Sequence, residues 1–230
     1  MALQAVATRR LYEQIAEQIS DLIGRGEFQP GSKLPAERDL ALTLGVSRPT
    51  VREALIALEL ADLVEVRVGV GVFVRKNPGA GVQLPSSKHS PLEVTVARAL
   101  IEPGIAAMAA TAMTDEGSQQ LDTCLDTLRQ ATERDEWSEE ADRQLHLCLA
   151  DHCGNGPLRE IDHALWHERL DEVNARWHRH LASVPGLLRT IMTQHEEIVS
   201  AVQDADPERA STAMKRHLDH VRRQMEGLWE

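Results

Sequence analysis

The sequence predicts a mostly α-helical protein in two parts, with one β-hairpin between them. Three observations predict this class. Two short helical patterns meet at a glycine before residue 60, and a stretch rich in β-branched residues follows them. From residue 91 to residue 230 only helical periods remain, without any strand signal. A chain of 230 residues is long enough for two modest domains.

The N-terminal part begins with a helix whose apolar stripe consists of Leu11, Ile15, Ile19, Leu22 and Ile23. Residues 34–52 then predict two short helices joined by a tight turn. We place Pro35 in the first turn of the first of these helices, where a missing N–H costs nothing. Gly45 ends that helix in a left-handed conformation.

The second short helix begins at Ser47, whose hydroxyl can accept a hydrogen bond from the backbone of the first turn. Its apolar stripe comprises Val51, Ala54, Leu55 and Leu58. Arg48 and Arg52 lie one turn apart on another face, near the end that a recognition helix inserts into the major groove. A plain helical hairpin with solvated arginines is the alternative.

The stretch after Asp62 favours the DNA-binding interpretation. It is rich in β-branched residues, and its apolar members are Leu63, Val64, Val66, Val68, Val70, Val72 and Val74. Gly69 and Gly71 stand where a hairpin must turn. Helices followed by such a hairpin predict a winged helix-turn-helix over residues 1–76.

Residues 10–76 resemble the winged helix-turn-helix of the GntR family of bacterial transcription regulators. The resemblance rests on F-x-P-G-x-x-L-P-A-E-R from Phe28, V-S-R-x-T-V-R-E-A-L from Val46, and the glycine-containing wing. It implies that seven positions contact DNA: Arg38, Ser47, Arg48, Pro49, Thr50, Arg52 and Gly69. Pro49 departs from the family pattern, which often has a polar residue there, and this departure bears on the operator sequence.

Charge is divided unevenly along the chain. Residues 1–76 are neutral overall, and residues 77–230 carry the net charge of −11. An acidic body cannot lie along phosphate, so it would stay away from DNA while the less acidic N-terminal part binds. The alternative is that the acidity only provides solubility.

Cys124, Cys148 and Cys153 are odd in number and show no C-x-x-C spacing. We therefore expect small buried thiols, no disulfide framework and a cytoplasmic protein. The N-terminal MALQAVATRR is too short for a signal peptide, and no uncharged apolar run reaches the length of a membrane span. We expect no membrane segment.

Residues 77–90 contain several prolines, glycines and serines and predict a linker. The remaining residues, 91–230, predict an all-α antiparallel bundle of six or seven helices. The expected helices are 91–112, 115–133, 138–153, 157–182, 185–204 and 207–228. An alternative breaks the first of them near Pro103.

Four side chains of the bundle suggest a metal site. Asp142 and His146 are four residues apart, so they share a helix face. His195 and His217 fall within the apolar series of two later helices and should point inward. Three histidines and a carboxylate on three helices can converge on a divalent cation. Taken singly, each histidine is more often a hydrogen-bonded core residue.

Residues 91–230 are similar to the all-helical effector domain of the FadR subfamily, known as FCD. The similarity rests on S-P-L-E-V from Ser90, R-x-x-x-E-P from Arg98, D-x-x-x-H from Asp142 and G-N-G-P-L from Gly154. It implies a bound divalent metal ion, most often zinc, with the ligands Asp142, His146, His195 and His217. Leu145 replaces the usual phenylalanine, which should alter packing more than ligation.

The same resemblance implies a small organic acid as effector. A carboxylate could fill coordination positions that four protein ligands leave open, and a guanidinium would pair with it. Arg98 is the first candidate for that guanidinium, and Arg143 and Asn174 are further effector-binding candidates, with Arg176 as a weaker one. Substitute ligands are His152, His163, His167, His178, His180 and His220. Cys148 and Cys153 beside His152 form a second conceivable metal set.

The runs RRLYEQIAEQ, REALIALE and LVEVRVG are similar to those of hexuronate regulators within this subfamily. We therefore favour a sugar acid, while lactate, pyruvate, another hydroxy acid or a dicarboxylate remain compatible. The expected protein is a homodimeric repressor that releases double-stranded operator DNA when the acid binds. A metal-dependent enzyme is disfavoured, because the chain has no H-E-x-x-H, nucleophile motif or phosphate loop. An architectural DNA-binding protein would have neither cavity nor metal.

Overall fold

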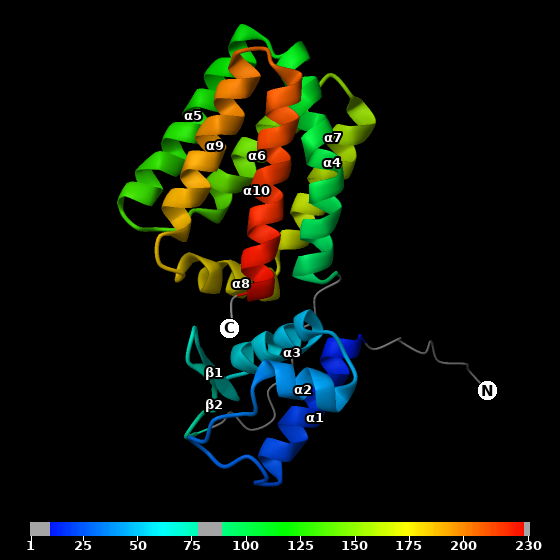
Figure 1. Ribbon diagram of the computed structural model, residues 1–230, viewed down its shortest axis with the longest axis vertical. Coiled ribbons are helices and arrows are strands. Elements are labelled where there is room, and N and C mark those ends of the chain that lie inside the picture. Colours follow the sequence, from blue (N-terminus) through cyan, green and yellow to red (C-terminus); the bar gives the residue numbers. More distant parts are fainter. Residues whose placement is uncertain (1–9, 78–88, 228–230) are drawn as a thin grey trace, which may run out of the picture. The chain divides into compact units, whose positions relative to one another are not determined.

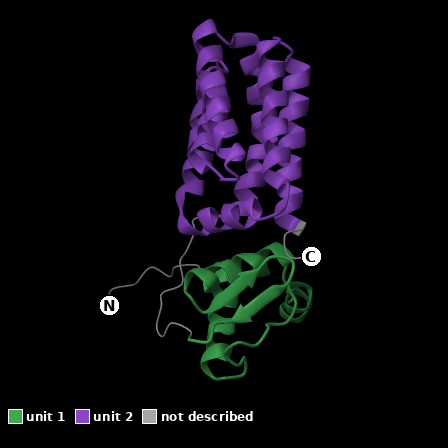
Figure 2. Ribbon diagram, turned by 90° about the vertical axis from the view of Figure 1, so that its left-hand side faces the viewer, with its two compact units in different colours: residues 1–86, 229–230 green, residues 87–228 purple. Residues whose placement is uncertain are grey.

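The computed structural model describes residues 10–77 and 89–227, and these residues form two compact units (Figure 2). Residues 10–77 belong to the N-terminal unit, and residues 89–227 form the helical bundle. Most of the linker expected over 77–90 lies outside the described residues, because these omit positions 78–88. The chain ends at 1–9 and 228–230 are outside them as well.

The N-terminal unit is a winged helix-turn-helix, as the sequence predicts. Its elements are α1 (Leu11–Gly24), α2 (Glu37–Leu44), α3 (Arg48–Leu60), β1 (Val64–Arg67) and β2 (Gly71–Val74) (Figure 1). Gly45 ends α2 at φ 66°, a left-handed conformation that glycine adopts without strain. Ser47 then caps α3, since its hydroxyl accepts a hydrogen bond from the N–H of Thr50 at 3.4 Å.

Two details of this unit differ from the expectation. Leu11 is 51% exposed, and the neighbouring Tyr12 is buried with Ile15, Ile19 and Ile23 instead. The inner stripe of α1 is therefore rotated by one position at its start. Pro35 lies before α2 and not in its first turn, because Ala36 is still extended and α2 begins at Glu37.

The wing is a two-stranded antiparallel hairpin in the register Val64 to Val74 and Val66 to Val72. Lys33 forms an isolated bridge to Phe73, so the segment before α2 lies along the outer side of β2. Alternate wing residues face the apolar core of the unit, which α1 and α3 complete. This core fixes the wing against the helices.

The bundle contains seven α-helices in the part of the chain that the structure describes. They are α4 (Pro91–Ala112), α5 (Asp115–Glu133), α6 (Glu139–Asp151), α7 (Gly156–His167), α8 (Glu172–Ala182), α9 (Leu187–Gln203) and α10 (Pro207–Gly227). Figure 1 shows the long helices side by side, with α10 packed against α4 and α9 and α5 packed against α6 and α9. The bundle places side chains from α4, α6, α7, α9 and α10 around one interior.

The helix expected over 157–182 is wrong, whereas the helix expected over 91–112 occurs without the alternative break near Pro103. The helix expected over 157–182 is divided into α7, a 3₁₀ turn (Glu168–Leu170) and α8. The division occurs at Asp171, which is extended and accepts a hydrogen bond from the N–H of Asn174 at 2.8 Å, so it caps a new helix. Pro103, in contrast, does not break α4. Its neighbours Glu102 and Ile105 are buried, so packing on both sides holds the helix across the proline.

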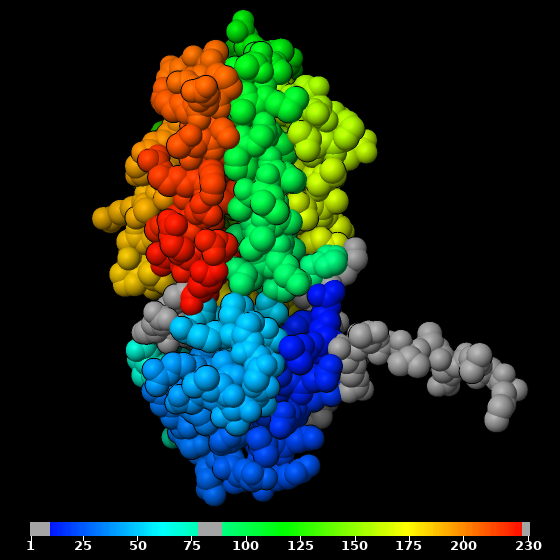
Figure 3. All heavy atoms as spheres, turned by 45° about the vertical axis from the view of Figure 1, so that its right-hand side comes forward, coloured from blue at the N-terminus to red at the C-terminus, as the bar shows by residue number. Residues whose placement is uncertain are grey.

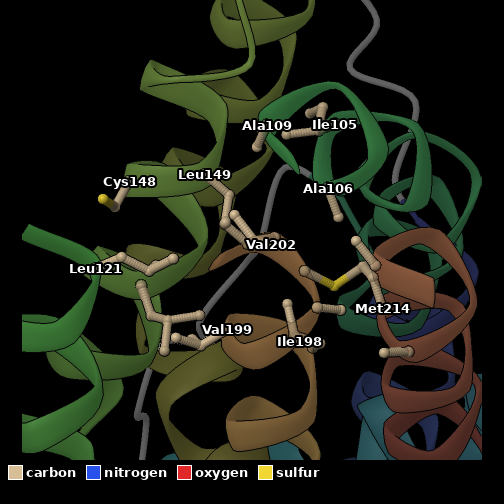
Figure 4. Close-up of a cluster of buried hydrophobic side chains, with 14 of the residues drawn as sticks. Ile105, Ala106, Ala109, Leu121, Cys148, Leu149, Ile198, Val199, Val202 and Met214 are labelled. Atoms are coloured by element: carbon tan, nitrogen blue, oxygen red, sulfur yellow. The ribbon is translucent and has the colours of Figure 1, made fainter. Parts of the chain in front are cut away.

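The apolar core of the bundle lies between α4, α5, α6, α9 and α10. Figure 4 shows Leu121, Leu149, Val199 and Val202 pointing toward one another from these helices, with Ile198 and Met214 nearby. One described helix, α4, is long and apolar enough by length and composition to cross a membrane. Half of its apolar window is buried, and one such helix is weak evidence for a membrane span.

Candidate metal centre and nucleic-acid interface

The four expected metal ligands come together in the interior of the bundle. Asp142 and His146 extend from α6, His195 from α9 and His217 from α10. One potential ligand atom from each residue lies within 4.8 Å of all the others, and all four side chains are buried. The His195 Nε2 lies 3.3 Å from Asp142 Oδ1 and 3.1 Å from His146 Nε2. We refer to these four residues as the ligand cluster.

Two neighbouring side chains orient the imidazoles of the ligand cluster. His146 Nδ1 lies 2.6 Å from Glu102 Oε2, and His217 Nδ1 lies 3.1 Å from Gln194 Oε1. Because both partners are oxygen acceptors, each Nδ1 carries the proton and each Nε2 is left with its lone pair. A carboxylate behind a ligating imidazole is a common arrangement in metal sites, since it fixes the tautomer and the ring orientation.

The protonation states suit a cation. Burial lowers the pKa of His146, and burial together with the neighbouring histidines holds the pKa of His217 well below its ordinary value. Burial opposes ionisation of Asp142, but its hydrogen bond with His195 and the nearby positive charges hold its pKa well below the usual range. Neutral imidazoles beside an ionised carboxylate are the ligand forms that divalent zinc requires. The residues present therefore fit a metal ion.

Charged and aromatic side chains surround the ligand cluster. The Arg98 Nε donates to Glu102 Oε1 at 2.5 Å, and the Arg98 guanidinium carbon lies 3.9 Å from the centre of the Trp166 ring. Arg169 lies over the same ring at 4.0 Å and donates to Asp142 Oδ2 at 3.4 Å. Burial opposes ionisation of Glu102, but the charge of Arg98 lowers its pKa to about 2. Two guanidinium groups thus lie beside the ligand cluster.

The three expected effector-binding residues lie in different places. Arg98 is buried beside His146, with 3.4 Å between its Nη2 and the imidazole Nδ1. Arg143 does not reach this interior, because its guanidinium makes two hydrogen bonds to Glu140 on the helix surface. Asn174 is buried, but its amide donates to the carbonyl of Glu168 and to Asp171, so it holds the turn before α8.

The second conceivable metal set does not form. Among the described residues, only the ligand cluster brings three or more metal-binding side chains together. Cys148 and Cys153 are buried in the apolar core, and the half-buried His152 pairs with Gln120 at 3.1 Å. The cysteines behave as the small apolar residues that the sequence suggests.

Sequence reasoning missed several residues around the ligand cluster: Glu102, Asp162, Trp166 and Arg169. His178, which it named as a substitute ligand, instead accepts a hydrogen bond from Arg169 at 3.2 Å. Two of the missed residues carry a signal that could have been used. Asp162 and Trp166 are four residues apart on α7, as Arg98 and Glu102 are on α4 and Asp142 and His146 are on α6. Three such pairs on three packed helices indicate a common interior.

The two recognition-helix arginines share one carboxylate in the N-terminal unit. Arg48 Nε donates to Glu37 Oε1 at 2.7 Å, and Arg52 donates to both oxygens of Glu37. Glu37 therefore links α2 to the first turns of α3, where a helix-turn-helix approaches base edges. The sequence did not single out Glu37. Arg48 keeps 37% of its side chain exposed, so it can reach a partner outside the protein.

The other expected DNA contacts lie around the start of α3 and at the wing. Ser47 and Thr50 share a hydrogen bond between their hydroxyls at 2.7 Å, and Pro49 lies between them in the first turn of the helix. Arg38 is exposed on α2, with 78% of its side chain accessible. Gly69 turns the wing at φ 72°, and nothing within 4 Å would meet a side chain added there.

Lys33 is a further wing residue that sequence reasoning missed. Its Nζ donates to the carbonyl of Val70 at 2.6 Å, so a cation is held at the tip of the wing. A Cβ added to Gly71 would lie 2.3 Å from Lys33 Cε, and the φ of Gly71 is 133°. The tip of the wing is thus built around Lys33 and a glycine.

Comparison with known proteins gives two family matches. The family described as bacterial regulatory proteins, gntR family, matches residues 11–74, and the FCD domain matches residues 93–220. The Uxu operon transcriptional regulator of Escherichia coli is 34% identical over 96% of this chain and 89% of its own length. The Exu regulon transcriptional regulator of the same organism is 34% identical over 96% of this chain and 86% of its own length.

A solved structure shares the fold. McbR/YncC of E. coli matches with a TM-score of 0.50 at 20% identity, covering 97% of this chain and 100% of that one. At this identity the match concerns the fold alone. It agrees with an N-terminal winged helix-turn-helix followed by a helical bundle.

Proposed function

Because the chain belongs to the GntR family of bacterial transcription regulators, in the FadR subfamily that carries an FCD domain, we propose that it is a repressor controlled by an organic acid at a bound metal ion. DNA-binding regulation follows from the family, whose members are regulators and not enzymes. The buried ligand cluster is the observation that carries the rest of the proposal. It unites Asp142, His146, His195 and His217, and the pKa shifts of Asp142, His146 and His217 favour the protonation states that a cation needs.

The proposed cofactor is a divalent ion, with zinc favoured. Three imidazole nitrogens and one carboxylate oxygen are a common donor set for zinc and also suit other first-row ions. When bound, the ion supplies a Lewis-acidic centre that attracts carboxylate oxygens. The Glu102 carboxylate and the Gln194 amide support this assignment, because they leave the Nε2 atoms of His146 and His217 as lone-pair donors.

The charges around the ligand cluster favour an anionic effector. Arg98 and Arg169 balance the ionised carboxylates of Glu102 and Asp142. A divalent ion then adds positive charge to a buried site, which an organic acid can neutralise. Arg98 is the proposed carboxylate partner because its guanidinium lies next to a ligand. A sugar acid is favoured, since the Uxu and Exu regulators are among the relatives.

The proposed active form is a homodimer. The face of α4 turned away from the bundle interior is apolar and includes Val96, which is 41% exposed, and Leu100, which is 79% exposed. Figure 3 shows α4 at the surface of the bundle between α10 and α7. A second copy of this chain would cover such a face, and two winged units would then bind two half-sites of one operator.

The proposed division of labour follows the expected domains: DNA binding by residues 1–76, a linker over 77–90, and effector binding and dimerisation by 91–230. Direct contacts to DNA are assigned to Arg38, Ser47, Arg48, Pro49, Thr50, Arg52 and Gly69. The exposure of Arg38 and the partial exposure of Arg48 support this assignment. Acid binding shifts the dimer toward an arrangement that fits the operator less well.

Fluorescence anisotropy tests the proposal. The labelled duplex is one that the purified full-length protein selects from a random library, and D-glucuronate is added to the zinc-loaded complex. We expect the acid to release the duplex from the wild-type protein. The double variant His146→Ala, His195→Ala should keep duplex binding without acid and lose the release. Equal release from the metal-free variant would contradict metal-dependent sensing.

A further inference from the structure

Two fully buried polar groups beside the ligand cluster lack hydrogen-bond partners among the described residues, apart from a contact between Asp162 and Glu102. They are the carboxyl group of Asp162, which is 0% exposed, and the indole N–H of Trp166, which is 1% exposed. Buried polar groups are nearly always hydrogen-bonded, because leaving one unpaired carries the full cost of removing it from water. Two such groups on one helix face therefore indicate that something else pairs with them.

Asp162 and Trp166 share the face of α7 that packs toward α4 and α6. The two residues are four apart, and α7 contacts both neighbouring helices. The Trp166 ring lies under the guanidinium of Arg98 and 5.1 Å from the imidazole of His146, measured between ring centres. Asp162 lies close enough to Glu102 and Arg98 for their charges to affect its pKa. Both unpaired groups therefore border the place proposed for the acid.

The neighbouring cations cannot pair with the Trp166 N–H. Arg98 and Arg169 lie over the ring at 3.9 and 4.0 Å, and a guanidinium group carries only hydrogen-bond donors. The N–H therefore needs an oxygen acceptor from outside the described side chains. Arg169 itself is engaged with His178 at 2.7 Å and with Asp142, so it holds the ring and a ligand together.

The Asp162 carboxyl group can both donate and accept. Burial, the charge of Glu102 and a hydrogen bond with Glu102 raise the pKa of Asp162 to about 8, so at neutral pH it is mostly a neutral carboxylic acid. Its O–H can donate to Glu102, which leaves its other oxygen as an acceptor. An alcohol hydroxyl can accept from the indole N–H and donate to this oxygen. A sugar acid has several of these beside its carboxylate, whereas lactate has one.

We infer that Asp162 and the Trp166 N–H form a hydroxyl-binding subsite next to Arg98, which selects polyhydroxylated acids over short hydroxy acids. The inference rests on the proposed function, because it needs an acid at the ligand cluster. It names two specificity-determining residues that belong neither to the metal ligands nor to the carboxylate partner. A site built around a hydroxyl rejects molecules that leave its buried polar groups unpaired.

The experiment is isothermal titration calorimetry of the full-length, zinc-loaded protein with D-glucuronate and with L-lactate. Trp166→Phe removes the N–H and keeps an aromatic face for the arginines. We expect the affinity for glucuronate to fall about tenfold and the affinity for lactate to change less than about twofold, since one hydrogen bond is lost. Zinc content, measured in each sample, should stay the same.

Trp177→Phe is the matched control. Trp177 is also 1% exposed and also has an indole N–H without a described partner, but it lies on α8 and makes no ring contact with the ligand cluster. Its variant should keep the glucuronate-to-lactate affinity ratio of the wild type. A merely structural effect of losing a buried indole N–H would shift both variants alike, and that result would overturn the inference.

Variants of Asp162 provide a second, independent test in the same titrations. Asp162→Asn keeps one donor and one acceptor and should bind glucuronate within about threefold of the wild type, whereas Asp162→Leu should lose about tenfold or more. Equal affinity ratios in Trp166→Phe and the wild type would overturn the hydroxyl subsite and leave the proposed function intact. If neither acid binds the zinc-loaded wild type, the proposed function is wrong and the subsite falls with it.

Discussion

The two units use the same chemical device, a glutamate between two basic side chains, for different ends. In the N-terminal unit Glu37 pairs with Arg48 and Arg52, so two permanent cations share one carboxylate. In the bundle Glu102 pairs with Arg98 and with His146, whose imidazole is neutral. The first group retains a positive charge that suits phosphate, while the second is balanced and leaves a lone pair for a metal ion. A second arginine leaves the group positively charged, whereas a neutral histidine leaves it balanced with a lone pair for a metal ion.

Replacing Asp162 in the metal-stripped protein should give the largest of the expected changes in stability. It also allows a buried carboxyl to be compared with one at the surface. Its pKa is raised from 3.8 to about 8, so the unfolded chain loses this proton near pH 4 while the folded protein keeps it. The contribution of Asp162 to the free energy of unfolding is therefore fully present below about pH 4 and is lost as the pH rises to about 8. Asp162→Asn should gain about 1.4 kcal/mol over the wild type for each pH unit in this window.

Urea denaturation at a series of pH values measures this difference. Asp219 provides the control, because its hydrogen bond with Lys215 lowers its pKa and it lies at the surface of α10. Its stabilisation is present above the ordinary pKa of an aspartate and is lost as the pH falls, so Asp219→Asn should show a small effect of the opposite sign. A pH-independent difference for Asp162→Asn would contradict the raised pKa.

Glu102→Ala should come next in size. It leaves the Arg98 guanidinium buried without its carboxylate, which costs about 3–5 kcal/mol when a buried pair is broken from one side. It also removes the acceptor behind His146, so zinc affinity should fall about 10–100-fold. Chemical denaturation and competition with a chromogenic chelator measure the two effects. Glu102→Gln, which retains an acceptor oxygen, should recover part of the zinc affinity.

Removing the metal should affect only the bundle. A ligand present at a hundred times its dissociation constant stabilises the folded state by about 2.7 kcal/mol. Calorimetry of the zinc-loaded protein should therefore show a bundle transition that moves to lower temperature with a chelator. The transition of the N-terminal unit should stay in place, since the ligand cluster lies wholly on α6, α9 and α10. Equal shifts of both transitions would count against a metal site confined to the bundle.

Arg52→Ala should produce the smallest of these effects and act on the other unit. The Arg52 side chain is 0% exposed and bonded to Glu37, so it reaches a base edge only by leaving that carboxylate. We expect operator binding to weaken by about 1–3 kcal/mol, the range for one lost bidentate base contact, with less loss on a shuffled duplex. Anisotropy with both duplexes measures the difference, and zinc content should equal that of the wild type. Since Glu37 then keeps Arg48 alone, Glu37→Gln in the same assay reports whether the shared carboxylate positions the arginines.

Local signals predicted most of the fold because they act within a few residues. Gly45 and Ser47 end one helix and start the next through their own backbone and hydroxyl, and both occur as expected. The α7–α8 boundary was missed because Asp171 lies inside an otherwise helical pattern, and its capping hydrogen bond is visible only in the structure. Pro103 shows the converse, since tertiary packing retains a helix that local rules would break.

The candidate site also contains some residues that the sequence could predict and others that only the structure shows. Helical spacing and family resemblance brought out the ligand cluster, which the structure assembles from α6, α9 and α10. Arg169 could not be singled out, because nothing local distinguishes a buried arginine that stacks on an indole from a solvated one. Arg143 illustrates this limit: it is next to a ligand in sequence, but its helix turns it toward Glu140 at the surface.

The guanidinium proposed to bind the acid and the exposed apolar face lie on the same helix. Arg98 and Leu100 are two positions apart on α4, which places them about 200° apart around the helix axis. Arg98 is buried and Leu100 is 79% exposed. An α-helix moves largely as one rigid element, so its two faces move together. Any rotation or translation of α4 on anion binding would therefore also move the surface that packs against Leu100.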